Sequence, residues 1–302
     1  MSFTLRVFDI LLKAFSRRGL GNIHLNDDMA LHFFNHAIKM DNIAAWFIKN
    51  NVHPVIATEH AHWNWVGDPT KTKRHILYLH GGGFIAHMPK IYRYWADRLA
   101  TMNDASVLLV DYPLAPSHPH PAGLNDCLNA YRWMIEDQKI PPQRIVIGGD
   151  SAGANLAITT LLRIKEENLP YPACTFALSP PVDLNAASPS MLSNEKSDPI
   201  SNYQLVKKIA GIYAPSGDYD HGTVSPLMGD FSGASPILLH AARNELLRDD
   251  SVRFYDKFKA VVPLELELWD HVPHCHQLFG FLPESRAARD NIQVFIAKYC
   301  TS

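Results

Sequence analysis

The sequence predicts an α/β protein with a mostly parallel central sheet that is flanked by helices. Three of its short strand-like runs, at 76–79, 107–110 and 145–147, are apolar at every position instead of alternating. Strands of a parallel sheet are buried on both faces, so they are expected to show this continuous apolar pattern. Helical segments lie between most of the later runs and supply the crossover connections that parallel strands need.

Composition narrows the class of protein further. The 302-residue chain is 47% hydrophobic and 19% charged, as in an ordinary globular protein. A chain of this length buries about 75% of its unfolded surface, so it forms a core without disulfide or metal support. It carries 28 basic and 30 acidic residues, for a net charge of −2, and has no long basic run. This balance argues against a nucleic-acid partner, because proteins that bind the phosphate backbone concentrate positive charge.

The spacing of the cysteines and the N-terminal sequence indicate the cellular compartment in which the protein is expected. The four cysteines are Cys127, Cys174, Cys275 and Cys300. They lack the paired short spacing of a zinc site or a disulfide framework, so we expect buried thiols in a reducing, cytoplasmic compartment. The N-terminal apolar stretch is interrupted by charged residues and lacks a convincing cleavage site, so no signal peptide is expected. No apolar run reaches the roughly 18 residues of a membrane span, so stable membrane insertion is not expected.

The spacing of apolar residues predicts where the helices and strands lie. Apolar residues recur three or four apart in the first fifty residues, which are expected to be helical. After Pro54, strand-like runs are expected at 55–66, 75–80, 106–111, 144–148, 174–178, 236–242 and 264–269. Further helices are expected at 121–138, 152–167, 249–260 and 284–299. Residues 183–224 carry one helical stretch, near 203–213, and no strand run, so we expect an insertion on top of the sheet.

One motif has the context of a nucleophile elbow. Gly149-Asp150-Ser151-Ala152-Gly153 follows a strand run and opens a helix. The glycines leave room where strand and helix backbones come together, and the turn holds the Ser151 hydroxyl clear of the sheet. The alternative is a plain glycine-rich connection that holds a phosphate. It is disfavoured because the chain has here neither a Walker lysine nor a dinucleotide-binding glycine spacing.

A second glycine motif precedes the first in the chain. His80-Gly81-Gly82-Gly83-Phe84 ends a strand run, and its glycines expose backbone N–H groups. Such donors stabilise the oxyanion that forms during acyl transfer, and loss of one donor typically costs about 3 kcal/mol. A plain glycine-rich turn is the alternative. The two motifs occur in the order expected for lipase-like and esterase-like hydrolases, which favours the oxyanion role.

A serine nucleophile in this architecture needs an acid and then a histidine further along the chain. Glu245 follows the strand run at 236–242 and is the preferred acid. Asp249 and Asp250 are rivals, but they are expected to begin the next helix, where acidic residues favour the positive end of the dipole.

Three histidines compete for the role of the base. His271, His274 and His276 all lie on the loop after the last strand run. Together with Cys275 they also suggest a metal site. That interpretation is disfavoured because they match none of the standard catalytic zinc patterns, so no metal is expected.

The motifs resemble those of the hormone-sensitive lipase family of α/β-hydrolases, the bacterial esterases with a His-Gly-Gly-Gly sequence. The resemblance extends from about residue 70 to the C-terminus. Besides the two glycine motifs it rests on Asp111-Tyr112-Pro113-Leu114-Ala115-Pro116, Pro121-Ala122 and Ser225-Pro226-Leu227. It implies the α/β-hydrolase fold, with a small helical cap over the site formed by 1–48 and 183–224. Residues 49–182 and 225–302 would form the catalytic core.

The resemblance also implies roles for individual residues. It makes Ser151 the nucleophile, Glu245 the acid and His274 the base. It places the oxyanion hole at Gly82, Gly83 and the N–H of Ala152. Ala242 stands where the family usually has glycine before the acid. This departure leaves Asp249 as an alternative to Glu245.

The function implied is that of a serine carboxylesterase that hydrolyses esters of short to medium acyl chains through an acyl-enzyme. Its partner would be a small ester, and the mechanism requires no cofactor. Homodimers are common in the resembled family, so a homodimer is a candidate assembly. An amidase, arylformamidase or peptidase with the same triad is one alternative. A ligand receptor on the same fold is another, although the presence of Ser151, His274 and an intervening acid argues against it.

Overall fold

The structure is a computed structural model, and it describes residues 52–300 together with eight residues of the N-terminal region. Those eight are Ser2, Leu5, Asn35, Ala37, Ile38, Lys39, Asp41 and Asn42. The helices expected in the first fifty residues, and with them the 1–48 part of the expected cap, therefore lie almost wholly outside the described residues.

Eight strands form one sheet in the order β1-β2-β4-β3-β5-β6-β7-β8. Their bounds are β1 Val55–Ala57, β2 Trp63–Val66, β3 Arg74–Leu79, β4 Ala105–Val110, β5 Ile145–Asp150, β6 Cys174–Leu178, β7 Ile237–Ala242 and β8 Leu264–Trp269. β1 and β2 pair antiparallel at one edge, and every pair from β4 to β8 is parallel. The prediction of a mostly parallel sheet is confirmed, and the carboxyl ends of six strands meet at one edge.

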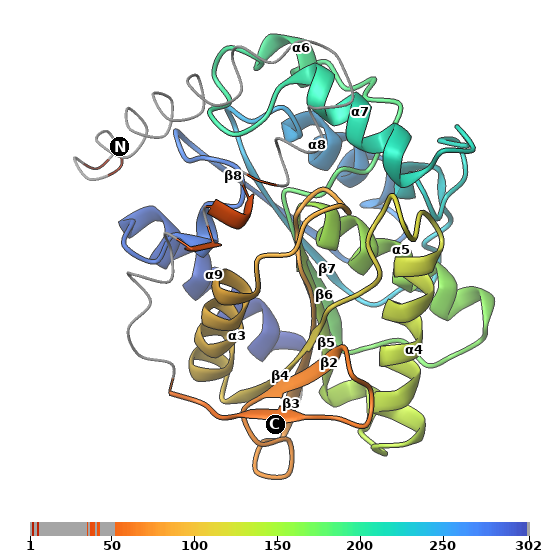
Figure 1. The fold of residues 1–302 in the computed structure, drawn as a ribbon, viewed down its shortest axis with the longest axis vertical. Coiled ribbons are helices and arrows are strands. Elements are labelled where there is room, and N and C mark those ends of the chain that lie inside the picture. The colour runs from red at the N-terminus through yellow and green to blue at the C-terminus, as the bar shows by residue number, and fades with distance from the viewer. Residues whose placement is uncertain are drawn as a thin grey trace.

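Helices cover both faces of this sheet (Figure 1). They are α3 Pro89–Asn103, α4 Ala122–Glu136, α5 Ala152–Glu166, α6 Ser190–Ser193, α7 Tyr203–Tyr213, α8 Arg248–Phe258 and α9 Pro283–Tyr299. Single 3₁₀ turns occupy Pro142–Arg144, Pro226–Met228 and His276–Leu278. α3 and α9 pack on one face through Trp95 and Phe295, whereas α4, α5 and α8 pack on the other. The four helices expected at 121–138, 152–167, 249–260 and 284–299 are confirmed as α4, α5, α8 and α9.

Two elements differ from the expectation. The single run expected at 55–66 is a hairpin of β1 and β2, because Thr58 Oγ1 closes a turn by accepting from His60 N–H (3.1 Å) and donating to the Trp63 carbonyl (2.9 Å). Helix α3 was not expected. Its N-cap residue, Met88, offers no capping oxygen. Asp41, far away in the sequence, caps it instead, and its Oδ1 accepts the N–H groups of residues 90 and 91 at 3.0 and 2.8 Å.

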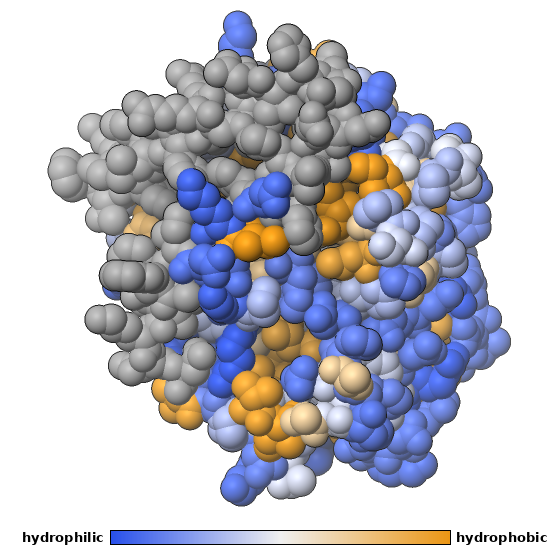
Figure 2. Space-filling model, in the orientation of Figure 1, coloured by the Kyte–Doolittle hydropathy of each residue, from blue (hydrophilic) through white to orange (hydrophobic). Residues whose placement is uncertain are grey.

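The exposed surface is mixed. On the face shown in Figure 2, hydrophobic residues occur in small groups among hydrophilic ones. The large exposed hydrophobic residues of the described chain come from different elements and include Val55, Leu192, Val261, Phe281 and Val294. Within residues 52–300 and the few described before them, no helix has the length and apolar character needed to cross a membrane.

Residues 183–224, called the insertion below, connect β6 to β7 and contain α6, α7 and no strand. The helix expected near 203–213 is confirmed as α7, and the four-residue α6 is additional. Both lie at one end of the sheet (Figure 1). Because the insertion starts after the carboxyl end of β6, it lies at the edge where the parallel strands end.

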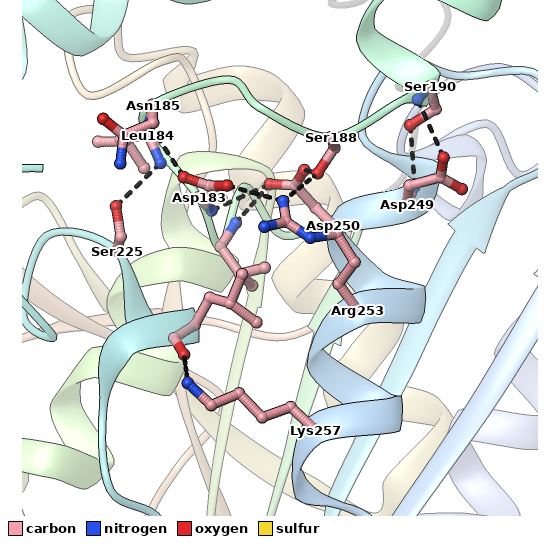
Figure 3. A network of polar contacts seen from close by, with 12 residues as sticks. Asp183, Leu184, Asn185, Ser188, Ser190, Ser225, Asp249, Asp250, Arg253 and Lys257 are labelled. Atoms are coloured by element: carbon pink, nitrogen blue, oxygen red, sulfur yellow. Dashed lines mark hydrogen bonds and ion pairs between the residues drawn. The ribbon is translucent and has the colours of Figure 1, made fainter. Parts of the chain in front are cut away.

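A buried carboxylate ties the start of the insertion to α8 (Figure 3). Asp250 Oδ2 accepts the N–H groups of Val182 (2.8 Å) and Asp183 (3.1 Å), and its Oδ1 accepts the hydroxyl of Ser188. Arg253 Nη1 donates to Asp183 Oδ2 (2.7 Å) and Ser188 Oγ (2.8 Å). Burial raises the pKa of Asp250 to about 7, and the hydrogen bonds oppose that rise only in part.

We expect Asp250→Asn to weaken the pH dependence of stability. The pKa of Asp250 is higher in the folded chain than the unfolded value near 4, so its contribution is full below about pH 4 and is lost as the pH rises through about 7. The pKa difference sets a ceiling of about 4 kcal/mol on that loss. The asparagine side chain keeps an oxygen that can accept the N–H groups of Val182 and Asp183, and its amide N–H can donate to the Ser188 hydroxyl.

The measurement is the free energy of unfolding in urea between pH 4 and 8. The matched control is Asp256→Asn, which changes an exposed carboxylate on the same helix. Equal pH slopes for Asp250→Asn and the native chain would contradict this assignment.

Candidate active site

Ser151 lies at the strained turn between β5 and α5. Its backbone has φ 51° and ψ −121°, in a region that residues other than glycine rarely adopt. A Cβ on Gly149 would meet the Gly153 carbonyl oxygen at 2.3 Å, and a Cβ on Gly153 would meet the Leu79 carbonyl oxygen at 2.0 Å. Only glycine fits at both positions. The turn therefore has the geometry of the expected elbow, with the Ser151 side chain partly exposed.

The second motif forms a tight turn beside the elbow. This glycine turn, residues 80–84, has φ 118° at Gly82 and φ 62° at Gly83. A Cβ on Gly82 would meet the Ala86 carbonyl oxygen at 2.1 Å, so a side chain is excluded there. Ala152 begins α5, and its N–H is among the helical donors without an intrahelical acceptor. Gly82 and Gly83 lie in the turn after β3. The start of that turn packs against the start of α5, where Ala152 lies, because a Cβ on Gly153 would meet the His80 carbonyl oxygen at 2.5 Å.

Asp150 joins the glycine turn to the elbow. Its Oδ1 accepts from the Tyr78 hydroxyl (2.7 Å) and the Gly81 N–H (3.0 Å), and its Oδ2 accepts from the Tyr92 hydroxyl (2.9 Å). Asp150 is buried, and burial raises the pKa of its carboxyl group. Sequence reasoning assigned it no role. The sequence feature that could have indicated a role is its position, since Asp150 is a carboxylate at the end of an apolar strand and directly precedes the serine.

Glu245 and His274 meet at the ends of β7 and β8. His274 Nδ1 lies 2.8 Å from Glu245 Oε2, and the Glu245 side chain is fully buried. The other oxygen, Oε1, accepts the Ala242 N–H at 3.1 Å, which fixes the carboxylate. A carboxylate can only accept, so Nδ1 of His274 carries the proton and Nε2 of the neutral ring is left as the acceptor.

The two rival acids have other partners. Asp249 Oδ2 accepts the Ser190 N–H (2.9 Å), and its own N–H donates to Ser190 Oγ (2.9 Å) (Figure 3). Asp250 is occupied by the start of the insertion, as described above. Both aspartates lie in the first turn of α8, as expected. Of the three carboxylates, Glu245 is the one that is hydrogen-bonded to His274.

The competing histidines are separated by the fold. His271 is exposed. His276 is buried, its ring centroid lies 5.5 Å from that of Trp269, and burial lowers its pKa to about 3. The histidines and Cys275 of this loop, considered above as an alternative metal site, do not form a group close enough to hold an ion. The described residues contain one group of histidine and acidic side chains close enough to hold a metal ion, and it lies elsewhere.

Ser151 and the loop of His274 are anchored on the same strand end. The Leu178 carbonyl accepts the Ser151 N–H at 2.8 Å and lies 3.7 Å from the Cys275 sulfur. The next residue, Ser179, places its hydroxyl 3.5 Å from the Cys275 N–H. The carboxyl end of β6 therefore sets the position of the serine relative to the histidine loop.

The surroundings of His274 favour its charged form. Burial lowers its pKa, but the hydrogen-bonded Glu245 opposes burial, and the pKa lies above the ordinary value. Burial raises the pKa of the Cys275 thiol to about 11, so that thiol is protonated at neutral pH. At neutral pH the Glu245 carboxylate is therefore the partner that stabilises the imidazolium.

The insertion holds the loop that carries the acid. Asn194 Nδ2 donates to the Glu245 carbonyl at 2.8 Å, and Asp198 Oδ2 accepts the Leu246 N–H at 2.9 Å. Both insertion residues are buried, and burial raises the pKa of Asp198. Sequence reasoning missed them, because polar residues in a segment without periodicity give no signal of which backbone they contact.

Comparisons with known proteins agree with this geometry. A family model described as the alpha/beta hydrolase fold matches residues 76–278. The chain is 31% identical over 244 residues to an acetyl-hydrolase of Streptomyces hygroscopicus, covering 80% of this chain and 81% of the relative. It is 34% identical over 225 residues to an esterase of Acinetobacter venetianus, covering 73% of each chain.

Solved structures show the same similarity over the whole length. The crystal structure of EstE5 soaked in ethyl alcohol has a TM-score of 0.89 and 29% identity, with 100% of both chains covered. An esterase from the bacterial hormone-sensitive lipase family has a TM-score of 0.86 and 29% identity, covering 100% of this chain and 99% of its own. Together with the elbow and the glycine turn, these matches make the chain a carboxylic ester hydrolase of the α/β-hydrolase fold, and it belongs to the hormone-sensitive lipase family.

Proposed function

We propose that the chain is a serine carboxylesterase that acts on esters of short to medium acyl chains through an acyl-enzyme. Ser151 is the nucleophile, His274 the general base, and Glu245 the acid that orients His274. The N–H groups of Gly82, Gly83 and Ala152 bind the oxyanion. The observation that carries the proposal is the 2.8 Å contact between Glu245 Oε2 and His274 Nδ1, on a loop anchored to the same strand end as Ser151.

The chemistry follows from these positions. His274 Nε2 takes the proton of the Ser151 hydroxyl as the oxygen attacks the ester carbonyl, and a tetrahedral oxyanion forms. The N–H donors stabilise that charge more strongly than the neutral carbonyl of the ground state. His274 then protonates the leaving alcohol, and in the second half it activates water to hydrolyse the acyl-enzyme. No step requires a metal or an organic cofactor.

The insertion, together with residues 1–48, is proposed as the cap that bounds the acyl pocket. Support comes from the contact of Tyr213 on α7 with Phe84 of the glycine turn, whose rings stack with centroids 3.7 Å apart. The short-chain preference is supported by the acetyl-hydrolase among the relatives. All four cysteines are buried thiols, which supports the proposed reducing, cytoplasmic location.

The first test is hydrolysis of p-nitrophenyl esters from acetate to palmitate by the native protein and Ser151→Ala. We expect the highest activity on short chains, no effect of a chelator, and at least a 10³-fold loss of kcat in the variant (roughly, by analogy with other serine hydrolases). Circular dichroism controls for folding. Substantial hydrolysis by folded Ser151→Ala would overturn the serine mechanism, and activity on matched anilides alone would point to an amidase.

The second test changes the acid. Glu245→Gln should lower kcat by about 10³–10⁴-fold, because glutamine stabilises neither the tautomer nor the imidazolium. The base acts only when neutral, so activity rises with pH through the pKa of His274. Removing the Glu245 charge lowers that pKa, so the acid limb of kcat/KM should move to lower pH.

The control for the acid is Asp249→Asn, which tests the rival directly. It should leave the midpoint of the acid limb unchanged. If Asp249→Asn moved the midpoint and Glu245→Gln did not, Asp249 would be the acid.

The third test addresses the insertion as a positioning element. Asn194→Ala removes the donor to the Glu245 carbonyl and should lower kcat about 10-fold with little change in KM, because a small displacement of the acid loop misaligns His274. Leu192→Ala, an exposed neighbour, is the matched control. Equal kcat values for the two variants would show that the insertion does not position the acid.

A further inference from the structure

Three potential metal ligands meet beside the glycine turn, and the proposed mechanism uses none of their side chains. β3 and β4 run parallel, with Leu79 paired to Val110. His80 directly follows β3 and Asp111 directly follows β4. The two residues therefore lie side by side at the same edge of the sheet. His87 joins them from the loop that precedes α3.

The distances suit a first-row divalent cation. His87 Nδ1 lies 3.1 Å and His80 Nε2 lies 3.7 Å from Asp111 Oδ1, and the three ligand atoms lie within 4.8 Å of one another. Two ligands that bind Zn²⁺ tetrahedrally at about 2.1 Å are about 3.4 Å apart. The two measured separations lie on either side of that value. His87 Nδ1 faces a carboxylate and therefore carries a proton in the metal-free chain, so binding requires the His87 ring to change to its Nε2–H tautomer.

The hydrogen bonding of His80 leaves a lone pair directed at this position. Its ring is fully buried, and Nδ1 lies 2.7 Å from the Gly81 carbonyl oxygen. A carbonyl can only accept, so Nδ1 carries a proton, and in the neutral ring Nε2 carries the lone pair. Among the described residues, Nε2 has no hydrogen-bond partner. A buried lone pair facing a carboxylate is unfavourable unless a cation or a donor lies between them.

The second shell and the access route also suit a metal. A histidine that ligates a metal usually donates its other ring N–H to a carbonyl or carboxylate, as Nδ1 of His80 does. The His80 ring is held further by stacking on Tyr112, with centroids 4.3 Å apart and planes 12° apart. The side chains of Asp111 and His87 are 41% and 23% exposed, which leaves a path from solvent and room for a water ligand.

We propose that His80, His87 and Asp111 bind one Zn²⁺ ion, with water in the fourth position. Two imidazoles and one carboxylate are ligands that Zn²⁺ accepts in tetrahedral geometry. The ion ties the first residue of the glycine turn to the end of β4, so it stabilises the folded chain by binding. The inference does not depend on the serine mechanism, because the ion takes no part in the acyl transfer.

The test uses untagged full-length protein stripped with a chelator. Isothermal titration with Zn²⁺ should show one site per chain, and Zn²⁺ at 100 times its Kd should raise Tm by about 5 °C. His87→Ala and Asp111→Asn should each weaken the affinity at least 100-fold (roughly, since each removes a ligand). His118→Ala is the matched control, because His118 is an exposed histidine outside the group, and it should bind as the native protein does.

The chain has 16 histidines, so adventitious binding is the competing outcome. Equal Zn²⁺ affinity for native protein and His87→Ala, or binding only at millimolar Zn²⁺, would overturn the proposal. If neither variant folds, Co²⁺ added to native protein decides the question. Intense visible bands of four- or five-coordinate Co²⁺ at one equivalent would support the site, whereas only the weak bands of octahedral Co²⁺ would reject it.

Discussion

The Asp150 carboxylate is the interaction on which the geometry of the site depends. It lies at the end of β5, one residue before Ser151, and holds the Gly81 N–H and two tyrosine hydroxyls. A buried carboxylate is costly unless its oxygens are hydrogen-bonded, so the three donors must stay in place. The same bonds that compensate its burial thus set the distance between the nucleophile turn and the glycine turn.

The loops that carry Glu245 and His274 are held by other contacts. The Leu178 carbonyl anchors both Ser151 and the loop of His274, while the insertion supplies Asn194 and Asp198 to the loop of Glu245. Each contact is to a backbone group at the carboxyl end of a parallel strand or in the loop that follows it. A parallel sheet gathers those ends at one edge, so residues far apart in the chain are held within hydrogen-bond distance.

Buried acids recur around the site and have distinct roles. Burial raises the pKa of Asp150, Asp198 and Asp250, and each of these side chains accepts backbone N–H groups. They organise loops, whereas Glu245, the fourth buried acid here, is hydrogen-bonded to His274. The pattern explains why a count of nearby carboxylates does not identify a catalytic acid: what matters is which loop turns which oxygen toward the imidazole.

The sequence by itself determined the sheet, four of its flanking helices, α7, and both glycine motifs, because apolar periodicity and close backbone contacts at glycine are local properties. It did not determine α3, which is capped by the distant Asp41, or the hairpin within 55–66. Residue patterns alone left three carboxylates and three histidines open, and the family resemblance named Glu245 and His274. The tertiary structure shows that these two are hydrogen-bonded, and that His80, His87 and Asp111 meet. These are contacts between strand ends and loops far apart in the chain, and their partners are set by strand order and burial, which no local spacing records.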